Sequence, residues 1–203
     1  MNENNILGVI LAGGKSRRIG TDKSIIKLGQ KTLIEHTISK IEKKFFEILI
    51  ISNNKNLIIN KKNVFFKEDS IKGNLGPLIG VFSAMDWIKK KNKNYEWIAT
   101  FPCDTPFFDN QIIDELKKKS NKTNKKLLFL KSGEKRHNIF GLWSVSLKNI
   151  LEKDIKNNYR KVEEWADKIG LETIDINTKN FNSFLNINTK EDLEEAKKNL
   201  DKI

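Results

Sequence analysis

The chain has 203 residues, of which 38% are hydrophobic, so we expect one globular domain over residues 1–203. No apolar run approaches the roughly 18 residues that span a bilayer, so we expect no transmembrane helix. The net charge is +12, but only four of the 38 basic residues are arginine and the lysine runs lack interleaved aromatic residues, which argues against nucleic acid or a membrane as a partner. The single cysteine excludes an internal disulfide, and the first residues lack the pattern of a secretory signal, so we expect a cytoplasmic protein.

The first half of the chain alternates between short apolar segments and amphipathic segments. Thr32 and Glu35 have the spacing of a capping box, which predicts a helix that begins at Leu33. Pro77 follows Gly76 at the start of a second helical pattern. We expect strands at residues 6–11, 47–52, 64–66 and 97–101, and helices at residues 33–41 and 77–90.

The alternation of strands and helices continues in the second half of the chain. Thr189 and Asp192 form another capping pair, which predicts a helix from residue 190. Strands are expected at residues 127–130, 138–145, 173–176 and 184–187, and further helices at residues 110–119, 147–151 and 162–169. This order predicts an α/β fold of three layers, α/β/α, with a Rossmann-like, mostly parallel sheet. Ligands of such sheets bind beyond the carboxyl ends of the strands.

A glycine-rich, basic segment from Leu11 to Lys23 follows the first expected strand. Its glycines allow the backbone to approach an anion, and its lysine and arginine side chains neutralise phosphate charge, which predicts a nucleoside triphosphate site. The segment is not a Walker A loop, because Val9 occupies a position where that motif needs a glycine. It also lacks the dinucleotide fingerprint G-x-G-x-x-G, because Gly13 and Gly14 are adjacent.

Other residues with chemical potential follow expected strands. Asp104 lies between Pro102 and Pro106, an arrangement that suits a fixed carboxylate, although an aspartate in this position also caps turns. Asp69 lies in a polar turn after the third strand, where an aspartate commonly forms an Asx turn. Cys103 has no evident base near it, and we expect a small buried side chain there rather than a nucleophile.

Five motifs, in order along the chain, carry a family resemblance. Residues 11–23 match the pattern L-A-G-G-x-S-x-R-M-G-x-D-K with Ile19 in place of methionine, and E-D at 68–69, G-P-L-x-G at 76–80, P-C-D-T-P at 102–106 and N-I-N-T-x-E-D at 186–192 follow. On these motifs the chain resembles the molybdenum cofactor guanylyltransferases, whose fold is of the nucleotide-diphospho-sugar transferase type. The resemblance implies transfer of GMP from GTP to the phosphate of molybdopterin, with release of pyrophosphate and formation of molybdopterin guanine dinucleotide.

The resemblance also assigns roles to individual residues. It implies that Arg18, Lys23 and Asp104 are catalytic and that Asp104 binds Mg²⁺, the cofactor expected for this reaction. The residues expected to bind GTP are Leu11, Ala12, Gly13, Gly14, Lys23, Ser52, Asp69 and Asp104, with Asn53 as the alternative to Ser52 for contact with the base. Those expected to bind molybdopterin are Arg136, His137, Asn186 and Asn188, the last two because residues two apart on a strand face the same way.

Several other functions stay open at this point. A molybdopterin cytidylyltransferase is the nearest alternative, but its loop reads L-A-A-G and lacks the aspartate before the lysine, whereas Gly13 and Asp22 follow the guanylyl pattern. Another small-molecule nucleotidyltransferase, such as one that acts on sugar 1-phosphates, would need more chain for its sugar-binding elements. A nucleotide-binding partner without activity is the third alternative, against which Lys23 and Asp104 both argue. The expected partners are GTP, molybdopterin and, transiently, the proteins that deliver molybdopterin and accept the finished cofactor.

Overall fold

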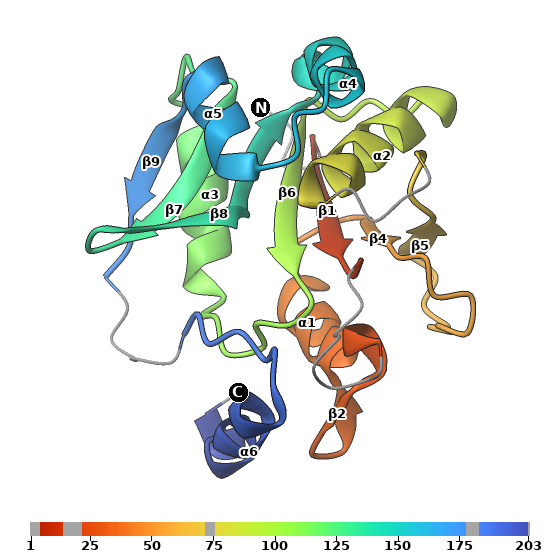
Figure 1. The fold of residues 1–203 in the computed structure, drawn as a ribbon, viewed down its shortest axis with the longest axis vertical. Coiled ribbons are helices and arrows are strands. Elements are labelled where there is room, and N and C mark those ends of the chain that lie inside the picture. The colour runs from red at the N-terminus through yellow and green to blue at the C-terminus, as the bar shows by residue number, and fades with distance from the viewer. Residues whose placement is uncertain (1–4, 14–21, 72–75, 178–182, 203) are drawn as a thin grey trace.

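The computed structural model describes residues 5–13, 22–71, 76–177 and 183–202. In these residues a seven-stranded sheet has the order β5-β4-β1-β6-β8-β7-β9 (Figure 1). Strand β8 is antiparallel to β6 and β7, and every other neighbouring pair in this sheet is parallel. The expected mostly parallel α/β sheet is therefore confirmed. Its strands are β1 (Ile6–Leu11), β4 (Ile48–Ile51), β5 (Val64–Lys67), β6 (Trp97–Pro102), β7 (Leu127–Ser132), β8 (Lys135–Ser144) and β9 (Glu172–Asp175).

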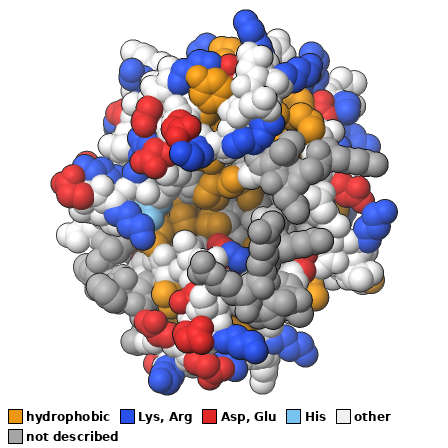
Figure 2. Space-filling model, viewed as in Figure 1, with side chains coloured by type: hydrophobic (Ala, Val, Ile, Leu, Met, Phe, Trp, Pro, Cys, Tyr) orange, Lys and Arg blue, Asp and Glu red, His pale blue; other side chains and the backbone are white. Residues whose placement is uncertain are grey.

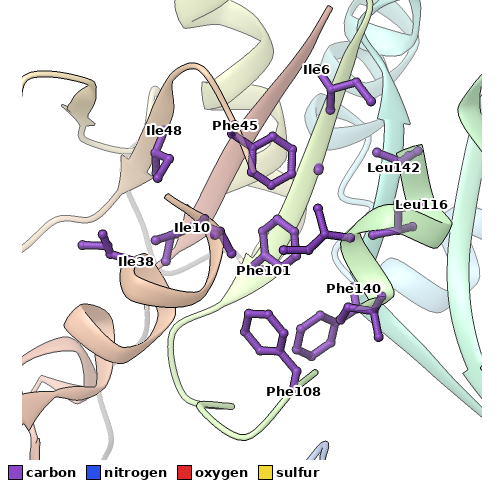
Figure 3. Packing of buried hydrophobic residues seen from close by; sticks show 14 of the residues in the cluster. Ile6, Ile10, Ile38, Phe45, Ile48, Phe101, Phe108, Leu116, Phe140 and Leu142 are labelled. Carbon is purple, nitrogen blue, oxygen red and sulfur yellow. The ribbon is translucent and has the colours of Figure 1, made fainter. Parts of the chain in front are cut away.

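Helices cover both faces of the sheet, because neighbouring side chains in a strand point to opposite faces. In β1, Ile10 lies in one hydrophobic cluster and Val9 in another. The cluster around Ile10 includes side chains of α1 (Leu33–Ile41) and α3 (Gln111–Ser120), and Figure 3 shows the rings of Phe101, Phe108 and Phe140 within it. The cluster around Val9 includes side chains of α2 (Pro77–Lys90), α4 (Lys148–Lys156) and α5 (Val162–Ile169). The described residues thus form the expected three layers, and none of their helices is long and apolar enough to cross a membrane.

A third hydrophobic cluster joins the last helix to a hairpin that the sequence did not predict. The hairpin consists of β2 (Lys27–Leu28) and β3 (Lys31–Thr32), and the helix is α6 (Lys190–Lys198). The cluster includes Leu28, Leu33 and Ala196. Strands of two residues have too little periodicity for a sequence pattern to reveal them. Short 3-10 helices are found at η1 (Lys23–Ile25), η2 (Val145–Leu147) and η3 (Leu200–Lys202).

The strand expected at residues 184–187 is wrong, because these residues form no strand. Their segment is instead tied to the end of β6, where the amide of Ile187 donates a hydrogen bond of 2.8 Å to the carbonyl oxygen of Asp104. Strand geometry therefore does not make the side chains of Asn186 and Asn188 face the same way. Their positions come from contacts with the segment at Asp104, not from a regular backbone.

The start of β8 also differs from the sequence prediction. The strand begins at Lys135 instead of Asn138, and its first residues pair with the end of β7. Residues 135–138 are polar or charged and show no apolar alternation, so their extended state depends on the neighbouring strand rather than on their own pattern. Arg136 and His137 therefore belong to a strand.

The chain order of the strands reverses between β1 and β6. From β1 the chain moves outward to β4 and β5, and it then returns to β6 on the other side of β1. The carboxyl ends of β1 and β6 consequently lie at a topological switch point, the position where open α/β sheets bind their ligands. In this chain the residues at that position are those from Leu11 to Gly13 and from Pro102 to Asp104.

Candidate active site

A cavity of about 780 Å³ opens at the point where the strand order reverses. Its walls come from the ends of β1, β4 and β6, the first turn of α2, and the first half of β8. Figure 2 shows a hollow with hydrophobic side chains near the centre of this face of the molecule. The volume lies within the range of roughly 300–1,000 Å³ that small-molecule sites occupy.

The cavity brings together many of the residues predicted for the site. Those that line it are Leu11, Ala12, Gly13, Lys23, Asp69, Asp104, Arg136, His137 and Asn186. Asn188 contacts Lys23 at its edge. Gly14 and Arg18 lie outside the described residues, so their predicted roles stay predictions. Residues from five separate segments of the chain thus meet at one site.

Lys23 is at the centre of the polar contacts in the cavity. Its Nζ lies 2.7 Å from Oδ2 of Asp104, and it also donates to Oδ1 of Asn188. Lys23 is the first residue of η1, which Asp22 caps by accepting bonds of 2.9 Å and 2.6 Å from the backbone amide and the hydroxyl of Ser24. The side chains of Lys23 and Asp104 are each 18% exposed, so a ligand in the cavity can reach both.

A second set of contacts surrounds Asp104. The hydroxyl of Thr105, which is fully buried, lies 3.4 Å from Oδ1 of Asp104 and donates to Oδ1 of Asn186. Thr105 therefore holds the amide oxygen of Asn186 near Asp104, and Lys23 holds the amide oxygen of Asn188 near the same carboxylate. Oxygen atoms of this kind are the ligands that Mg²⁺ and Mn²⁺ prefer.

Asn53 and Asp69 form a pair at the ends of β4 and β5. Nδ2 of Asn53 donates to Oδ2 of Asp69 at 2.7 Å, and the amide of Asp69 donates to Oδ1 of Asn53 at 3.0 Å. Burial raises the pKa of Asp69, against the opposing effect of the hydrogen bond from Asn53. Ser52 is 7% exposed, and its hydroxyl accepts a bond from the amide of Asn54. Asn53 lines the cavity and Ser52 is not among the lining residues, so the geometry favours Asn53 for contact with a ligand.

The first turn of α2 lies close against the end of β1. A Cβ atom on Gly80 would lie 2.9 Å from Cδ2 of Leu11, so only glycine allows this approach without a shift of the leucine. The helix starts at Pro77 and has no acidic side chain in its first turn, so none of the residues in that turn neutralises the positive end of its dipole. Cys103 is 4% exposed, and burial raises the pKa of its thiol, which supports a packing role for this side chain.

Arg136 is bound to acidic side chains of α5. Its Nη1 donates to Oδ1 of Asp167 at 2.7 Å, its Nη2 lies 3.5 Å from Oε1 of Glu163, and its Nε donates to Oδ1 of Asn138 at 2.7 Å. The contact with Arg136 lowers the pKa of Asp167. Two carboxylates thus partly neutralise the guanidinium, and this reduces its attraction for an acidic ligand. Its predicted contact with molybdopterin stays a prediction.

His137 lies in the cavity wall as a neutral ring. It stacks on Phe184 with 3.7 Å between the ring centroids, and its Nε2 lies 2.7 Å from Oγ of Ser132. Burial, with a smaller effect from the charge on Lys135, lowers the pKa of His137 to about 4. At neutral pH the imidazole therefore carries no charge.

We expect the stability of the protein to fall between about pH 6.5 and pH 4, and His137 to cause part of that fall. The folded-state pKa lies below the ordinary value of 6.5, so the unfolded chain binds more protons in this range. The contribution of neutral His137 to the free energy of unfolding is fully present above pH 6.5. It is lost at up to about 1.4 kcal/mol per pH unit as the pH falls towards 4. Urea unfolding of the wild type and of His137→Gln at pH 7, 6, 5 and 4 measures it. Equal pH dependence in both proteins would contradict the prediction.

Comparison with known families identifies the chain. A model described as the MobA-like NTP transferase domain matches residues 8–169. The chain belongs to the MobA-like NTP transferase family. A molybdenum cofactor guanylyltransferase from Haemophilus influenzae (strain 86-028NP) is 31% identical over 192 residues, which cover 94% of this chain and 97% of that relative. The match supports a nucleotidyltransferase of molybdenum cofactor biosynthesis.

Solved structures of MobA-like and related proteins share the fold. Molybdopterin-guanine dinucleotide biosynthesis protein A from Archaeoglobus fulgidus has a TM-score of 0.81 at 23% identity, and the match covers 97% of this chain and 100% of that chain. A Mycobacterium tuberculosis protein solved in complex with manganese has a TM-score of 0.66 at 11% identity, with 96% of this chain and 98% of that chain covered. The fold is that of the nucleotide-diphospho-sugar transferases, as the resemblance implied.

Sequence reasoning missed part of the cavity wall of this MobA-like transferase. Ile139, Phe140 and Phe184 line the cavity, but none of them was predicted for the site. Phe184 stands two residues before the N-x-N motif, and that proximity was the one available signal. Gly80 belonged to a family motif, yet only the structure shows its contact with Leu11. Apolar residues look the same in a sequence whether they fill a core or line a cavity.

Proposed function

We propose that this MobA-like transferase moves GMP from GTP to the terminal phosphate of molybdopterin and releases pyrophosphate. The observation that carries the proposal is the Lys23 ammonium, which lies between the Asp104 carboxylate and the Asn188 amide oxygen beside the topological switch point. This arrangement combines a cation for phosphate charge with a carboxylate for a metal. The name of the Haemophilus influenzae relative supports the choice of reaction, because the two chains align over nearly their whole lengths.

The proposed reaction is an in-line displacement at the α-phosphorus of GTP. A phosphate oxygen of molybdopterin forms a bond to that phosphorus, and the bond from the phosphorus to the oxygen that bridges to the β-phosphate breaks. Pyrophosphate leaves with the electron pair of that bond, so no covalent intermediate on the protein is needed. The protein has to hold the two phosphates in line and to neutralise their charge. We assign charge neutralisation to Lys23 and Arg18, and contacts to the nucleotide to the backbone from Leu11 to Gly14.

The residues around Asp104 suit a magnesium ion. Mg²⁺ takes one or two carboxylates together with substrate phosphates and water, and it does not need a dense acidic cluster. In the described part of the chain no group of three or more histidine, cysteine, aspartate or glutamate side chains is placed to hold a metal. We propose that Asp104 holds the ion and that the amide oxygens of Asn186 and Asn188 stand beside it. When bound, Mg²⁺ would spread the negative charge of the triphosphate.

We place the guanine base at Asn53 and Asp69. A carboxylate accepts hydrogen bonds and donates none when ionised. Guanine presents two neighbouring N–H donors, at N1 and N2, whereas cytosine presents an acceptor beside its amino group. Asn53 donates one hydrogen bond to the Asp69 carboxylate and accepts one from the Asp69 backbone amide, so Asp69 is oriented before the base arrives. This chemistry favours GTP over CTP.

We expect GTP to be the nucleotide that supports transfer. The experiment incubates the protein with molybdopterin, Mg²⁺ and each of GTP, CTP, ATP and UTP in turn, and measures pyrophosphate. GTP should react at least about 100-fold faster than the others, because only guanine presents two neighbouring N–H donors to the carboxylate of Asp69. A reaction without molybdopterin separates transfer from hydrolysis. Pyrophosphate release with CTP and not with GTP would overturn the proposal in favour of a cytidylyltransferase.

A further inference from the structure

One wall of the cavity is aromatic, and the proposed transfer of GMP uses none of its aromatic side chains. The rings of His137 and Phe184 are stacked, with centroids 3.7 Å apart and planes inclined by 20°. Phe140 meets Phe184 edge-on at 5.0 Å and His137 at 6.5 Å. All three residues line the cavity. Phe140 is buried and supports the stack, whereas Phe184 is half-buried, so part of its ring is accessible to a ligand.

A bulge in β8 builds this wall. The pairing of β7 and β8 changes register between Phe129 and Leu130, which leaves residues 138–140 of β8 as the bulge. All three bulge residues line the cavity. The next residue is Gly141, where a Cβ atom would lie 2.2 Å from the carbonyl oxygen of Leu128, so β8 can approach β7 this closely only with glycine. Bulges next to active sites turn side chains towards the ligand, and this bulge does so for Phe140.

The His137 ring is held in one orientation and is neutral. Oγ of Ser132, at 2.7 Å, binds its Nε2, and Phe184 covers one of its faces. The pKa of about 4 leaves the imidazole uncharged at neutral pH. A neutral, rigid stack attracts another flat, uncharged ring more than it attracts a phosphate.

The strand order places this wall away from the proposed guanine site. Asn53 follows β4 and Asp69 follows β5, on one side of β1. His137 lies at the start of β8, which is antiparallel and therefore begins at the same edge of the sheet. Strands β4 and β8 are three positions apart in the sheet, which corresponds to roughly 14 Å at the usual strand spacing. Asp104 follows β6, which lies between β4 and β8 in the sheet, and Lys23 contacts Asp104. The phosphates would therefore react between the guanine site and the aromatic wall.

We propose that the stack of His137 and Phe184 binds the pterin ring of molybdopterin. The pyrimidinone ring of the pterin in molybdopterin is flat and uncharged, and the pterin is joined to the phosphate that must reach the α-phosphorus of GTP. With guanine on one side of Lys23 and the pterin on the other, the two phosphates meet between them. The inference rests on the proposed function. The resemblance already implied His137 for molybdopterin, and the structure adds the ring stack and Phe184 as a binding residue for the pterin.

Phe184→Leu tests the inference, because leucine keeps an apolar side chain and removes the ring. Stacking of a flat base on an aromatic residue contributes roughly 1–3 kcal/mol, so KM for molybdopterin should rise about 5-fold to 150-fold. The Kd of GTP, measured by calorimetry, should change less than about twofold. Phe184→Tyr restores the ring and should recover most of the lost affinity. Phe46→Leu is the matched control, since Phe46 is 66% exposed and lies outside the cavity lining.

A second measurement separates this inference from the proposed function. A simple pterin such as 6-carboxypterin is fluorescent, and its binding should raise its fluorescence anisotropy with the wild type and much less with Phe184→Leu. Binding of this pterin without GMP transfer would support the pterin site and contradict the proposed reaction. An unchanged KM for molybdopterin in Phe184→Leu would overturn the pterin site while transfer stands, and so would an equal loss of GTP affinity in that variant.

Discussion

Replacement of Asp104 by asparagine should lower the rate of GMP transfer by about 10³-fold and leave the fold intact. Asparagine has nearly the same shape, and its oxygen is able to accept the hydrogen bond that Lys23 now donates to Asp104 at 2.7 Å. The substitution therefore removes the negative charge, which we propose as the anchor of Mg²⁺. Steady-state pyrophosphate release over a series of Mg²⁺ concentrations measures the effect, and thermal denaturation reports on the fold.

Asp114→Asn is the matched control for this variant. Asp114 also pairs with a lysine, Lys44, at 2.7 Å, but the pair is on the surface and outside the cavity lining. The control should keep the wild-type rate, because exposed ion pairs contribute at most about 1 kcal/mol. Transfer by Asp104→Asn within about threefold of the wild type would refute the role proposed for Asp104.

Replacement of Lys23 by methionine should lower kcat by about 10²-fold and raise the Kd of GTP about 10-fold. Methionine has a similar length, so the change removes the ammonium group and retains most of the volume. The Lys23 side chain is only 18% exposed, and in such a partly desolvated position the attraction of its ammonium for a triphosphate is stronger than in bulk water. Single-turnover kinetics with molybdopterin give the rate of transfer, and calorimetry gives the Kd.

Lys23→Met also leaves Asp104 without its ion pair, so its structural effect must be measured separately. We expect the free energy of unfolding to fall by about 1–2 kcal/mol, since both side chains are partly exposed. Lys44→Met, which breaks the surface pair with Asp114, should leave kcat and the Kd of GTP unchanged. Reduced stability with a wild-type kcat would mean that Lys23 only supports the structure.

The central strands and the helix starts could be predicted from the sequence because their signals are local. The run from Ile6 to Leu11 is apolar throughout, as expected of a strand buried on both faces, and it forms β1. The capping boxes at Thr32 and Thr189 are present in the structure as the spacing predicts. The carboxylate of Asp104 could be chosen as a candidate because a strand ended just before it.

Other parts of the site depended on details that a local pattern does not contain. Ser52 and Asn53 are adjacent at the end of β4, and a difference of one residue decides which side chain lines the cavity. Phe140 faces the cavity because of a register change between two strands. Phe184 belongs to an irregular segment, whose position depends on contacts with the end of β6 rather than on its own periodicity.

The order of motifs along the chain was enough to predict the family, the fold class and the type of residue at each strand end. Each of these depends on residues that are close together in the sequence. The meeting of Lys23 with Asp104 and Asn188, which lie 81 and 165 residues further along, depended on the tertiary structure alone. Strand order brings such distant residues together, and it results from the packing of whole strands and helices against one another. For that reason the partners of the Lys23 ammonium, which the sequence predicted to bind phosphate, are seen only in the folded molecule.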